Sequence, residues 1–312
     1  MVKKIVVLMG GWNSEREVSL SSGEAVYNAL IKLGYDAIKV DFDRDVVTKL
    51  QKIKPDVVFN ALHGRFGEDG RIQGLLDILN IAYTHSGLLP SAICMDKILT
   101  RRICNSYNLR SPEYDILIKG NHEDNKKIIT KIGKPFVIKP VSEGSSIGVE
   151  IILENFKFNI GDYSWQYGDK MIIEKYIAGQ ELHVGIMDNK ALGIVEVRPK
   201  KLFYDYECKY TSGMTDYIVP AEISKEKYQE AMDLALKCHK NLGLRGISRV
   251  DFILNNKDSG QTNFDNQIYL LEINTHPGFT PNSLVPKIAK YLGIEFEDII
   301  EYLVKSANCG LE

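Results

Sequence analysis

The sequence predicts a mixed α/β and α+β fold, in which an N-terminal doubly wound parallel sheet is followed by a two-part α+β region. In the first third of the chain, short apolar runs alternate with helical patterns, as in parallel sheets whose faces are covered by helices. In the rest, strand patterns follow one another with fewer helices between them. We therefore expect three units, residues 1–95, 96–178 and 179–312.

The first unit opens with a continuous apolar run at residues 5–9, which is typical of a buried parallel strand. Gly10 and Gly11 interrupt this run. Apolar residues then recur with helical spacing over about residues 19–33, and Gly34 ends that helix. The same patterns predict strands at 37–40, 57–60 and 82–84, and helices at 46–53 and 74–79.

The second and third units contain most of the predicted strands. In the second unit we expect a helix over 95–107 and strands at 136–139, 149–153 and 171–175. In the third we expect strands at 181–187, 191–197, 246–254 and 267–274, a helix over 224–242 and two closing helices. The irregular stretch 198–216 has the length of a functional loop and could close over a site.

Composition favours small-molecule chemistry. Lys and Arg number 39 and Asp and Glu 41, a formal net charge of −2, whereas nucleic-acid-binding proteins usually carry a basic surplus. The five cysteines are odd in number and none are spaced as C-x-x-C, which disfavours a disulfide framework and a zinc ribbon. The apolar run at 5–9 is too short for a signal peptide, and no stretch of 18 apolar residues exists. We expect a cytoplasmic protein that binds neither nucleic acid nor membrane.

Three oxygen-bearing side chains converge in the last third. Glu272 and Asn274 are two apart on one predicted strand, so they share a face, and Asp251 lies on the preceding strand. A short polar loop joins the two strands into an antiparallel hairpin. The neighbouring residues are apolar, so a carboxylate there needs a partner. Hard oxygen ligands of this kind suit Mg²⁺ together with nucleotide phosphates.

A glycine-rich loop at 143–148 follows the predicted strand that ends at Lys139 and Pro140. Its backbone N–H groups and its serine hydroxyls could bind phosphate oxygens, and Lys139 could add a positive charge. A plain hairpin turn explains the loop equally well. The loop also matches G-x-S-x-G around Ser146, the signature of a serine hydrolase, but that motif requires a following helix, and a β-branched run follows here.

Two further loops and one arginine complete the candidate site. The loops at 10–17 and 63–70 follow the first and third strands, at the edge where open parallel sheets bind ligands. Glu15 could meet an ammonium group, although an exposed acid in a first helical turn is the simpler explanation. His63 is a supporting candidate. Arg249 could bind a carboxylate or an acyl phosphate, or it could form a salt bridge with Asp251 or Glu272.

Eight segments, in this order along the chain, resemble the D-alanine–D-alanine ligase family of the ATP-grasp superfamily. They are GGWNSEREVSLSSG from Gly10, ALHGRFGEDG from Ala61, MDK from Met95, KPVSEGSSIGV from Lys139, IEKYIAGQEL from Ile173, FYDYECKY from Phe203, RVDF from Arg249 and LLEINTHPGFTPNSLVP from Leu270. The resemblance implies a substrate-binding domain followed by the two subdomains of an ATP-grasp fold, with ATP held between the central and C-terminal sheets. It also implies a homodimer.

The resemblance assigns roles to individual residues. Around ATP it implies Lys97, Lys139, Ser145, Glu174, Lys175, Ile177, Glu181 and Lys209. On two Mg²⁺ ions, or Mn²⁺, it implies Asp251, Glu272 and Asn274. For substrate binding it implies Glu15, His63, Lys209, Ser283 and Leu284, and for catalysis Glu15, Ser145, Tyr210, Arg249 and Gly278.

The implied reaction is the ATP-dependent ligation of two D-alanines through an acyl phosphate, for peptidoglycan precursors. Tyr210 accompanies dipeptide formation in the family, whereas members that form depsipeptides often carry Phe. Another ATP-grasp ligase with a different small acid and amine is the main alternative, and the set of Glu15, Arg249 and Ser283 favours small α-amino acids over it. A non-catalytic nucleotide-binding module is a second alternative, which the complete metal set disfavours.

Overall fold

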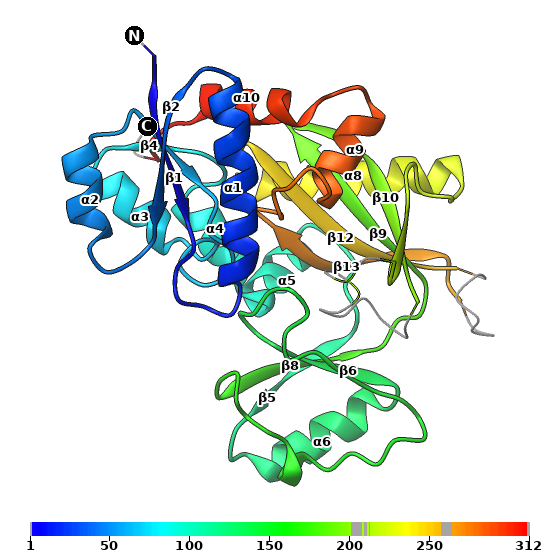
Figure 1. The fold of residues 1–312 in the computed structure, drawn as a ribbon. Coiled ribbons are helices and arrows are strands. Elements are labelled where there is room, and N and C mark those ends of the chain that lie inside the picture. The colour runs from blue at the N-terminus through cyan, green and yellow to red at the C-terminus, as the bar shows by residue number, and fades with distance from the viewer. Residues whose placement is uncertain (1, 201–207, 209–210, 212, 257–263, 311–312) are drawn as a thin grey trace.

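The first sheet is parallel and carries helices on both faces (Figure 1). The computed structural model describes residues 2–200, 208, 211, 213–256 and 264–310. The strand order is β2 (Asp36–Asp41), β1 (Lys4–Met9), β3 (Val57–Asn60) and β4 (Ala82–Tyr83). Every pairing between these strands is parallel. The predicted N-terminal fold class is confirmed.

Alternate residues of β1 divide this sheet between two cores. Ile5 and Val7 pack with helix α1 (Arg16–Lys32) and with the last helix, α10 (Phe296–Ser306). Val6 and Leu8 pack on the other face with α2 (Val46–Ile53) and α3 (Arg71–Ile78). The chain therefore returns at its end to cover the first sheet, which joins the C-terminal region to the N-terminal one.

The helix expected over 95–107 is present as α5 (Lys97–Ser106). A helix that the sequence did not predict, α4 (Leu88–Met95), precedes it, and Asp96 separates the two in an extended conformation. The Asp96 carboxylate accepts hydrogen bonds from the backbone N–H groups of Ile98 and Leu99, both at 2.9 Å, which is the geometry of an N-terminal cap. The cap starts a new helix and places Lys97 in its first turn.

The small second sheet is antiparallel. Its order is β5 (Tyr114–Ile118), β8 (Lys170–Lys175), β6 (Phe136–Pro140) and β7 (Glu150–Ile152), with α6 (His122–Ile132) packed against it and a short 3₁₀ turn at Ile160–Asp162. The sequence did not predict β5 or α6. Of the residues of α6, only Asn125 and Ile132 are fully buried, so the helix has a weak apolar face and a weak sequence signal.

The third sheet is antiparallel, in the order β11 (Thr215–Ile218), β10 (Lys190–Pro199), β9 (Gln180–Met187), β12 (Ile247–Asn255) and β13 (Gln267–Asn274). Helix α8 (Lys225–Asn241) covers one face and α9 (Leu284–Tyr291) packs on β9 and β10. Gly185 and Gly193 lie under α9, because a Cβ on either would stand 3.2 or 3.1 Å from Ile288. Within the described ranges, no helix combines the length and apolarity needed to span a membrane.

A buried histidine in this third unit predicts an acid-sensitive stability. His239 on α8 is fully buried and its Nδ1 lies 2.8 Å from the Ser248 hydroxyl of β12. Burial, aided by Lys240, lowers the pKa of His239 to about 4. In the unfolded chain the pKa of a histidine is about 6.5, so between that pH and about pH 4 the unfolded state binds a proton that the folded state does not bind. Stability should fall by about 1.4 kcal/mol per pH unit from about pH 6.5 towards pH 4.

Replacing His239 with Gln removes this proton uptake. Between neutral pH and about pH 5, we expect the variant to lose about 2 kcal/mol less unfolding free energy than the parent protein. Urea unfolding at the two pH values measures the difference, and the direct cost of the substitution cancels because each protein is compared with itself. Equal losses in the two proteins would contradict the assignment.

Candidate active site

A cavity between the second and third sheets combines apolar and charged side chains. The predicted ATP residues Lys97, Lys139, Glu174, Lys175, Ile177 and Glu181 all line it, together with Val137, Ile151, Tyr176, His183, Asp251, Ile253, Leu271 and Glu272. The apolar members come from both sheets and suit a planar ring, while the lysines suit phosphates. The sequence therefore named most of the polar lining of this cavity.

Two buried cations share one buried carboxylate in this cavity. Lys139 Nζ lies 2.6 Å from one oxygen of Glu174, and Arg101 on α5 binds the other oxygen. Burial alone would raise the pKa of the Glu174 carboxyl, but Arg101 and Lys139 outweigh it and lower that pKa. Burial lowers the pKa of Lys139 to about 8, against the pull of Glu174. The group carries a surplus positive charge, which suits an anionic ligand.

The sequence patterns did not single out Arg101. Its only signal in the sequence is its place four residues after Lys97, on the same face of a helix, and the structure shows that its side chain is only 1% exposed. Lys97 itself donates to the backbone carbonyl of Glu143 at 2.6 Å and so joins α5 to the glycine-rich loop.

Lys175 is directed towards the end of α6 in this structure. Its Nζ donates to the backbone carbonyls of Ile132, Gly133 and Lys134 at the end of α6, at 3.4, 3.2 and 3.0 Å. Glu181 lies 3.0 Å from Nε2 of His183. These contacts hold the two residues at the wall of the cavity, and their roles towards ATP stay predictions.

The predicted metal set is assembled by the β12–β13 hairpin. Asp251 pairs in register with Glu272, and Arg249 with Asn274. The Asn274 amide nitrogen lies 3.1 Å from Asp251 Oδ2 and 3.4 Å from Glu272 Oε1. The hairpin is antiparallel and its carboxylates converge, as predicted. Asp251 is buried, whereas the Glu272 side chain is 30% exposed.

Asp251 is held as a carboxylate by Arg249 and His183. Arg249 donates from Nε and Nη2 to its two oxygens, each at 2.7 Å, and His183 Nδ1 lies 2.7 Å from Oδ1. Burial would raise the pKa of Asp251, but Arg249 and His183 hold it well below its usual range. The salt bridge between Arg249 and Asp251, one of the two roles predicted for Arg249, is thus present. Arg249 also lines the neighbouring cleft.

The residues fit a hard divalent cation that is completed by a ligand. Two carboxylates and one amide oxygen are the donors Mg²⁺ takes from proteins that also supply it with phosphate oxygens. Among the described residues, no group of three or more His, Cys, Asp or Glu side chains could hold a metal ion. Nucleotide phosphates would add oxygens of the kind that Mg²⁺ takes beside one or two carboxylates.

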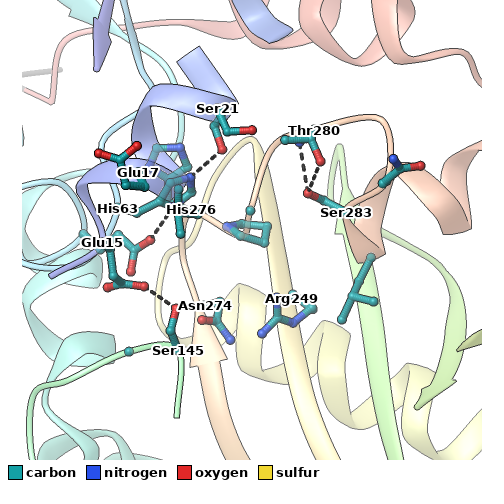
Figure 2. A pocket seen from close by; sticks show the side chains of 18 of the residues that line it. Glu15, Glu17, Ser21, His63, Ser145, Arg249, Asn274, His276, Thr280 and Ser283 are labelled. Atoms are coloured by element: carbon teal, nitrogen blue, oxygen red, sulfur yellow. Dashed lines mark hydrogen bonds and ion pairs between the residues drawn. The ribbon is translucent and has the colours of Figure 1, made fainter. Parts of the chain in front are cut away.

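A second cleft, of about 460 Å³, opens between the first and third sheets. In Figure 2, Glu15 and Ser145 point towards each other on one side, Arg249 and Asn274 lie on the floor, and Thr280 and Ser283 lie on the far side. Glu15, Ser145, His63, Arg249, Gly278, Ser283 and Leu284 from the predicted set all line it. Glu272 lines both this cleft and the cavity between the second and third sheets.

Glu15 is not an exposed helix-end acid. It is 5% exposed and precedes α1 as its cap residue, and Ser145 donates a hydrogen bond to its carboxylate. Two glycines make room for it. A Cβ on Gly64, whose φ is +65°, would lie 2.2 Å from Glu15 Oε2, and one on Gly144 would lie 3.0 Å away. The glycines of two separate loops therefore surround one carboxylate.

The far wall of the cleft is the start of α9. Ser283 is the residue before this helix, so the backbone N–H groups of Leu284 and Val285 in its first turn are open to an anion. Thr280 N–H donates to Ser283 Oγ at 3.0 Å, which fixes the turn. A Cβ on Gly278 would lie 3.4 Å from the same Oγ, so the loop at Gly278 passes close to the start of the helix.

Three site residues that the sequence did not single out are Arg101, His183 and Glu68. His183 pairs in register with Asp251 across β9 and β12, and Glu68 lies 3.1 Å from Nδ1 of His63.

The predicted residues Lys209 and Tyr210 lie outside the described residues. The hydrolase reading fails on context, since β7 and not a helix follows Gly148.

Comparisons with known proteins agree on one family. Residues 103–305 match the model of the D-ala D-ala ligase C-terminus, and residues 44–86 match that of the N-terminus. The D-alanine–D-alanine ligase of Rickettsia canadensis is 46% identical over 307 residues, 98% of this chain and 84% of that protein. That of Wolbachia sp. subsp. Drosophila simulans is 46% identical over 309 residues, 98% and 94% of the two. The crystal structure of the Bacillus anthracis ligase complexed with ATP superposes with a TM-score of 0.83 at 30% identity, covering 98% and 97% of the chains.

Proposed function

The chain belongs to the D-alanine–D-alanine ligase family, and we propose that it joins two D-alanines into D-alanyl-D-alanine while converting ATP to ADP and phosphate. The dipeptide serves peptidoglycan precursor synthesis. The observation that carries the proposal is that Glu272, beside Asp251 and Asn274, faces both the cavity of the lysines and the cleft of Glu15. A phosphoryl group can therefore pass from one space to the other at this point.

A carboxylate is a poor electrophile, so the first D-alanine is activated as an acyl phosphate before the amine of the second attacks it. Lys97 and Lys139 neutralise phosphate charge, and Glu15 holds the ammonium of the first D-alanine. Arg249 and the Gly278 backbone N–H stabilise the tetrahedral centre. The α9 start, at Ser283 and Leu284, binds the carboxylate of the second D-alanine.

Asp251, Glu272 and Asn274 would hold Mg²⁺ or Mn²⁺, two ions in the family pattern. Bound there, the metal would neutralise negative charge on the transferring phosphoryl group. Arg249 holds Asp251 ionised by two hydrogen bonds, so the chain itself keeps the carboxylate ready as a ligand. Ser145 orients the Glu15 carboxylate by donating to it, which fixes the acceptor for the substrate ammonium.

We divide the chain into a substrate-binding domain, 1–95, a central ATP-grasp subdomain, 96–178, and a catalytic subdomain, 179–312. Each contains one of the three sheets, which supports the division. The break at Asp96 between α4 and α5 supports the first boundary. Tyr210 favours an amine over a hydroxy acid as the second substrate, a proposal that rests on residue type alone.

The test is ADP release with Mg²⁺-ATP and D-alanine, with L-alanine and no amino acid as controls, and product identification by mass. We expect ADP release that requires D-alanine and a product with the mass of the dipeptide. ADP release only with a different acid would overturn the substrate assignment while leaving the ATP-grasp chemistry. ATP binding without turnover of any acid would overturn the enzymatic assignment.

We also propose that the protein is a homodimer that pairs through α3 and α4. Three large apolar side chains on these helices are exposed: Ile78 at 83%, Leu88 at 44% and Leu89 at 65%. A Cβ on Gly74, four residues before Ile78, would lie 2.7 Å from Leu88, so the two helices present one surface. Covering exposed apolar area of this kind favours association.

The double substitution Ile78→Glu and Leu89→Glu should convert the dimer to a monomer, because it would place charges in an apolar contact. Light scattering coupled to size-exclusion chromatography measures the mass. Leu292→Glu, at an exposed apolar residue after α9, is the matched control and should remain a dimer. A parent protein that runs as a monomer would refute the proposal, and so would a dimer that survives the double substitution.

A further inference from the structure

A chain of buried hydrogen bonds crosses the inner end of the substrate cleft. Ser22 on α1 is fully buried, and its Oγ lies 2.8 Å from Nε2 of His63. His63 is 3% exposed, and its Nδ1 lies 3.1 Å from Glu68 Oε1. At the other end, the backbone N–H of Phe279 donates to Ser22 Oγ at 3.4 Å. All three side chains line the cleft.

The bonding partners indicate the direction of this chain. The Glu68 carboxylate can only accept a hydrogen bond, so His63 carries its proton on Nδ1 and donates it there. The other nitrogen of a neutral imidazole is an acceptor, so Ser22 donates its O–H to His63 Nε2, while its oxygen accepts from Phe279 N–H. Both nitrogens of His63 are therefore used inside the protein, so the imidazole cannot offer a nitrogen to a substrate without breaking one of these bonds.

This series of hydrogen bonds joins the two walls of the cleft that hold the two substrates. Ser22 lies seven residues after Glu15 on the helix that Glu15 begins, and Phe279 follows Gly278 directly. His63 and Glu68 belong to the loop after β3, whose carbonyls at His63 and Arg65 accept bonds from Asn13 at 2.8 and 2.6 Å. The His63 ring also packs on His276 of the C-terminal wall, with centroids 5.2 Å apart.

We propose that Ser22, His63 and Glu68 are positioning residues that clamp the N-terminal wall of the cleft, with Glu15, to the C-terminal loop that carries Gly278. The inference rests on the proposed ligase function and deepens it. The two reacting groups are held from opposite walls, so a small change in the spacing of the walls misaligns the attack of the amine on the acyl phosphate. His63 thereby acts by fixing distance and not by touching the reacting atoms.

A loosened clamp has a chemical consequence. When the amine is misplaced, water attacks the acyl carbon instead, the bond between that carbon and the phosphate oxygen breaks, and D-alanine and inorganic phosphate are released. ATP is consumed without dipeptide, so the ratio of ADP to dipeptide rises above one. Ser22, His63 and Glu68 do not line the ATP cavity, so the KM for ATP should not change.

Ser22→Ala breaks the clamp, and Ser248→Ala is a matched control. Ser248 is also fully buried and also hydrogen-bonds a histidine at 2.8 Å, but its partner is His239, which lies outside the cleft. We expect similar losses of unfolding free energy in both variants. Only Ser22→Ala should raise the KM for D-alanine, by about tenfold, and produce excess ADP over dipeptide. Identical behaviour of the two variants overturns the proposal.

Glu68 provides a second test if Ser22→Ala fails to fold, since its side chain is partly exposed. Glu68→Gln keeps an oxygen that can accept from His63 Nδ1–H, so the ratio of ADP to dipeptide should stay near one. Glu68→Leu has no such oxygen, so this ratio should rise. Equal ratios of ADP to dipeptide in these two variants overturn the proposal. The parent protein is measured first, because absence of any dipeptide there would mean that the ligase function, and not the clamp, is wrong.

Discussion

Replacing Glu272 with Gln should lower the rate of dipeptide formation by about a thousandfold without unfolding the protein. Glu272 is the carboxylate shared by the two cavities, and an amide cannot supply the negative charge that a divalent cation needs. Its side chain is 30% exposed. Among the described residues its ion-pair partner is Arg249 Nη2 at 3.9 Å, which is itself bound to Asp251, so the substitution leaves that arginine paired.

The diagnostic measurement is the Mg²⁺ dependence of ADP release. We expect the half-saturating Mg²⁺ concentration to rise at least about tenfold in the Glu272→Gln variant. ATP binding measured without Mg²⁺ should stay close to the parent value. Glu301→Gln, on the surface of α10, is the control and should change neither quantity. An unaltered Mg²⁺ dependence would remove Glu272 from the metal set.

The second large effect concerns the buried ion group of the ATP cavity. Glu174→Gln should destabilise the protein by about 3–5 kcal/mol, because it leaves Arg101 and Lys139 buried without their carboxylate. Lys139→Met should cost much less, since the pair between Arg101 and Glu174 remains and methionine fills the space of the lysine stem. The ATP affinity of the Lys139 variant should nevertheless fall by about a hundredfold.

Urea unfolding and ATP titration of both variants separate these effects. The expected pattern is an unstable Glu174 variant and a stable Lys139 variant that binds ATP weakly. Equal stabilities would show that the carboxylate does not balance both cations. Strong ATP binding by Lys139→Met would show that this lysine does not meet the phosphates.

Local patterns predicted most of the fold because the apolar period was clear. β1, α2 and β3 form where continuous or helical apolar patterns stood, and the β12–β13 hairpin brings Asp251 and Glu272 into register. Helix α4 was not predicted, because only Ser91 and Cys94 among its residues are fully buried and no regular apolar period marks it. The return of α10 to the first sheet is a long-range contact that no local pattern encodes.

The partners of the site residues were harder to predict than the residues themselves. His183 stands next to Asp251 only because β9 pairs with β12 in that register, and Arg101 reaches Glu174 from a helix far away in the sequence. Ser22 and Glu68 are ordinary polar residues until the packing of α1 against the loop after β3 brings Ser22 to His63, and the fold of that loop brings Glu68 there. Their roles depend on packing between elements, which a single sequence does not display.

The most direct test of the account follows the carboxylate oxygen of the first substrate. D-alanine labelled with ¹⁸O in its carboxyl group is incubated with the protein, Mg²⁺ and unlabelled ATP, and the released phosphate is analysed by mass. If an acyl phosphate forms and the second amine displaces its phosphate, one ¹⁸O passes to phosphate for each dipeptide made. Dipeptide formed with unlabelled phosphate would contradict the acyl-phosphate route, and with it the roles we assign to Lys139, Arg249 and Glu272.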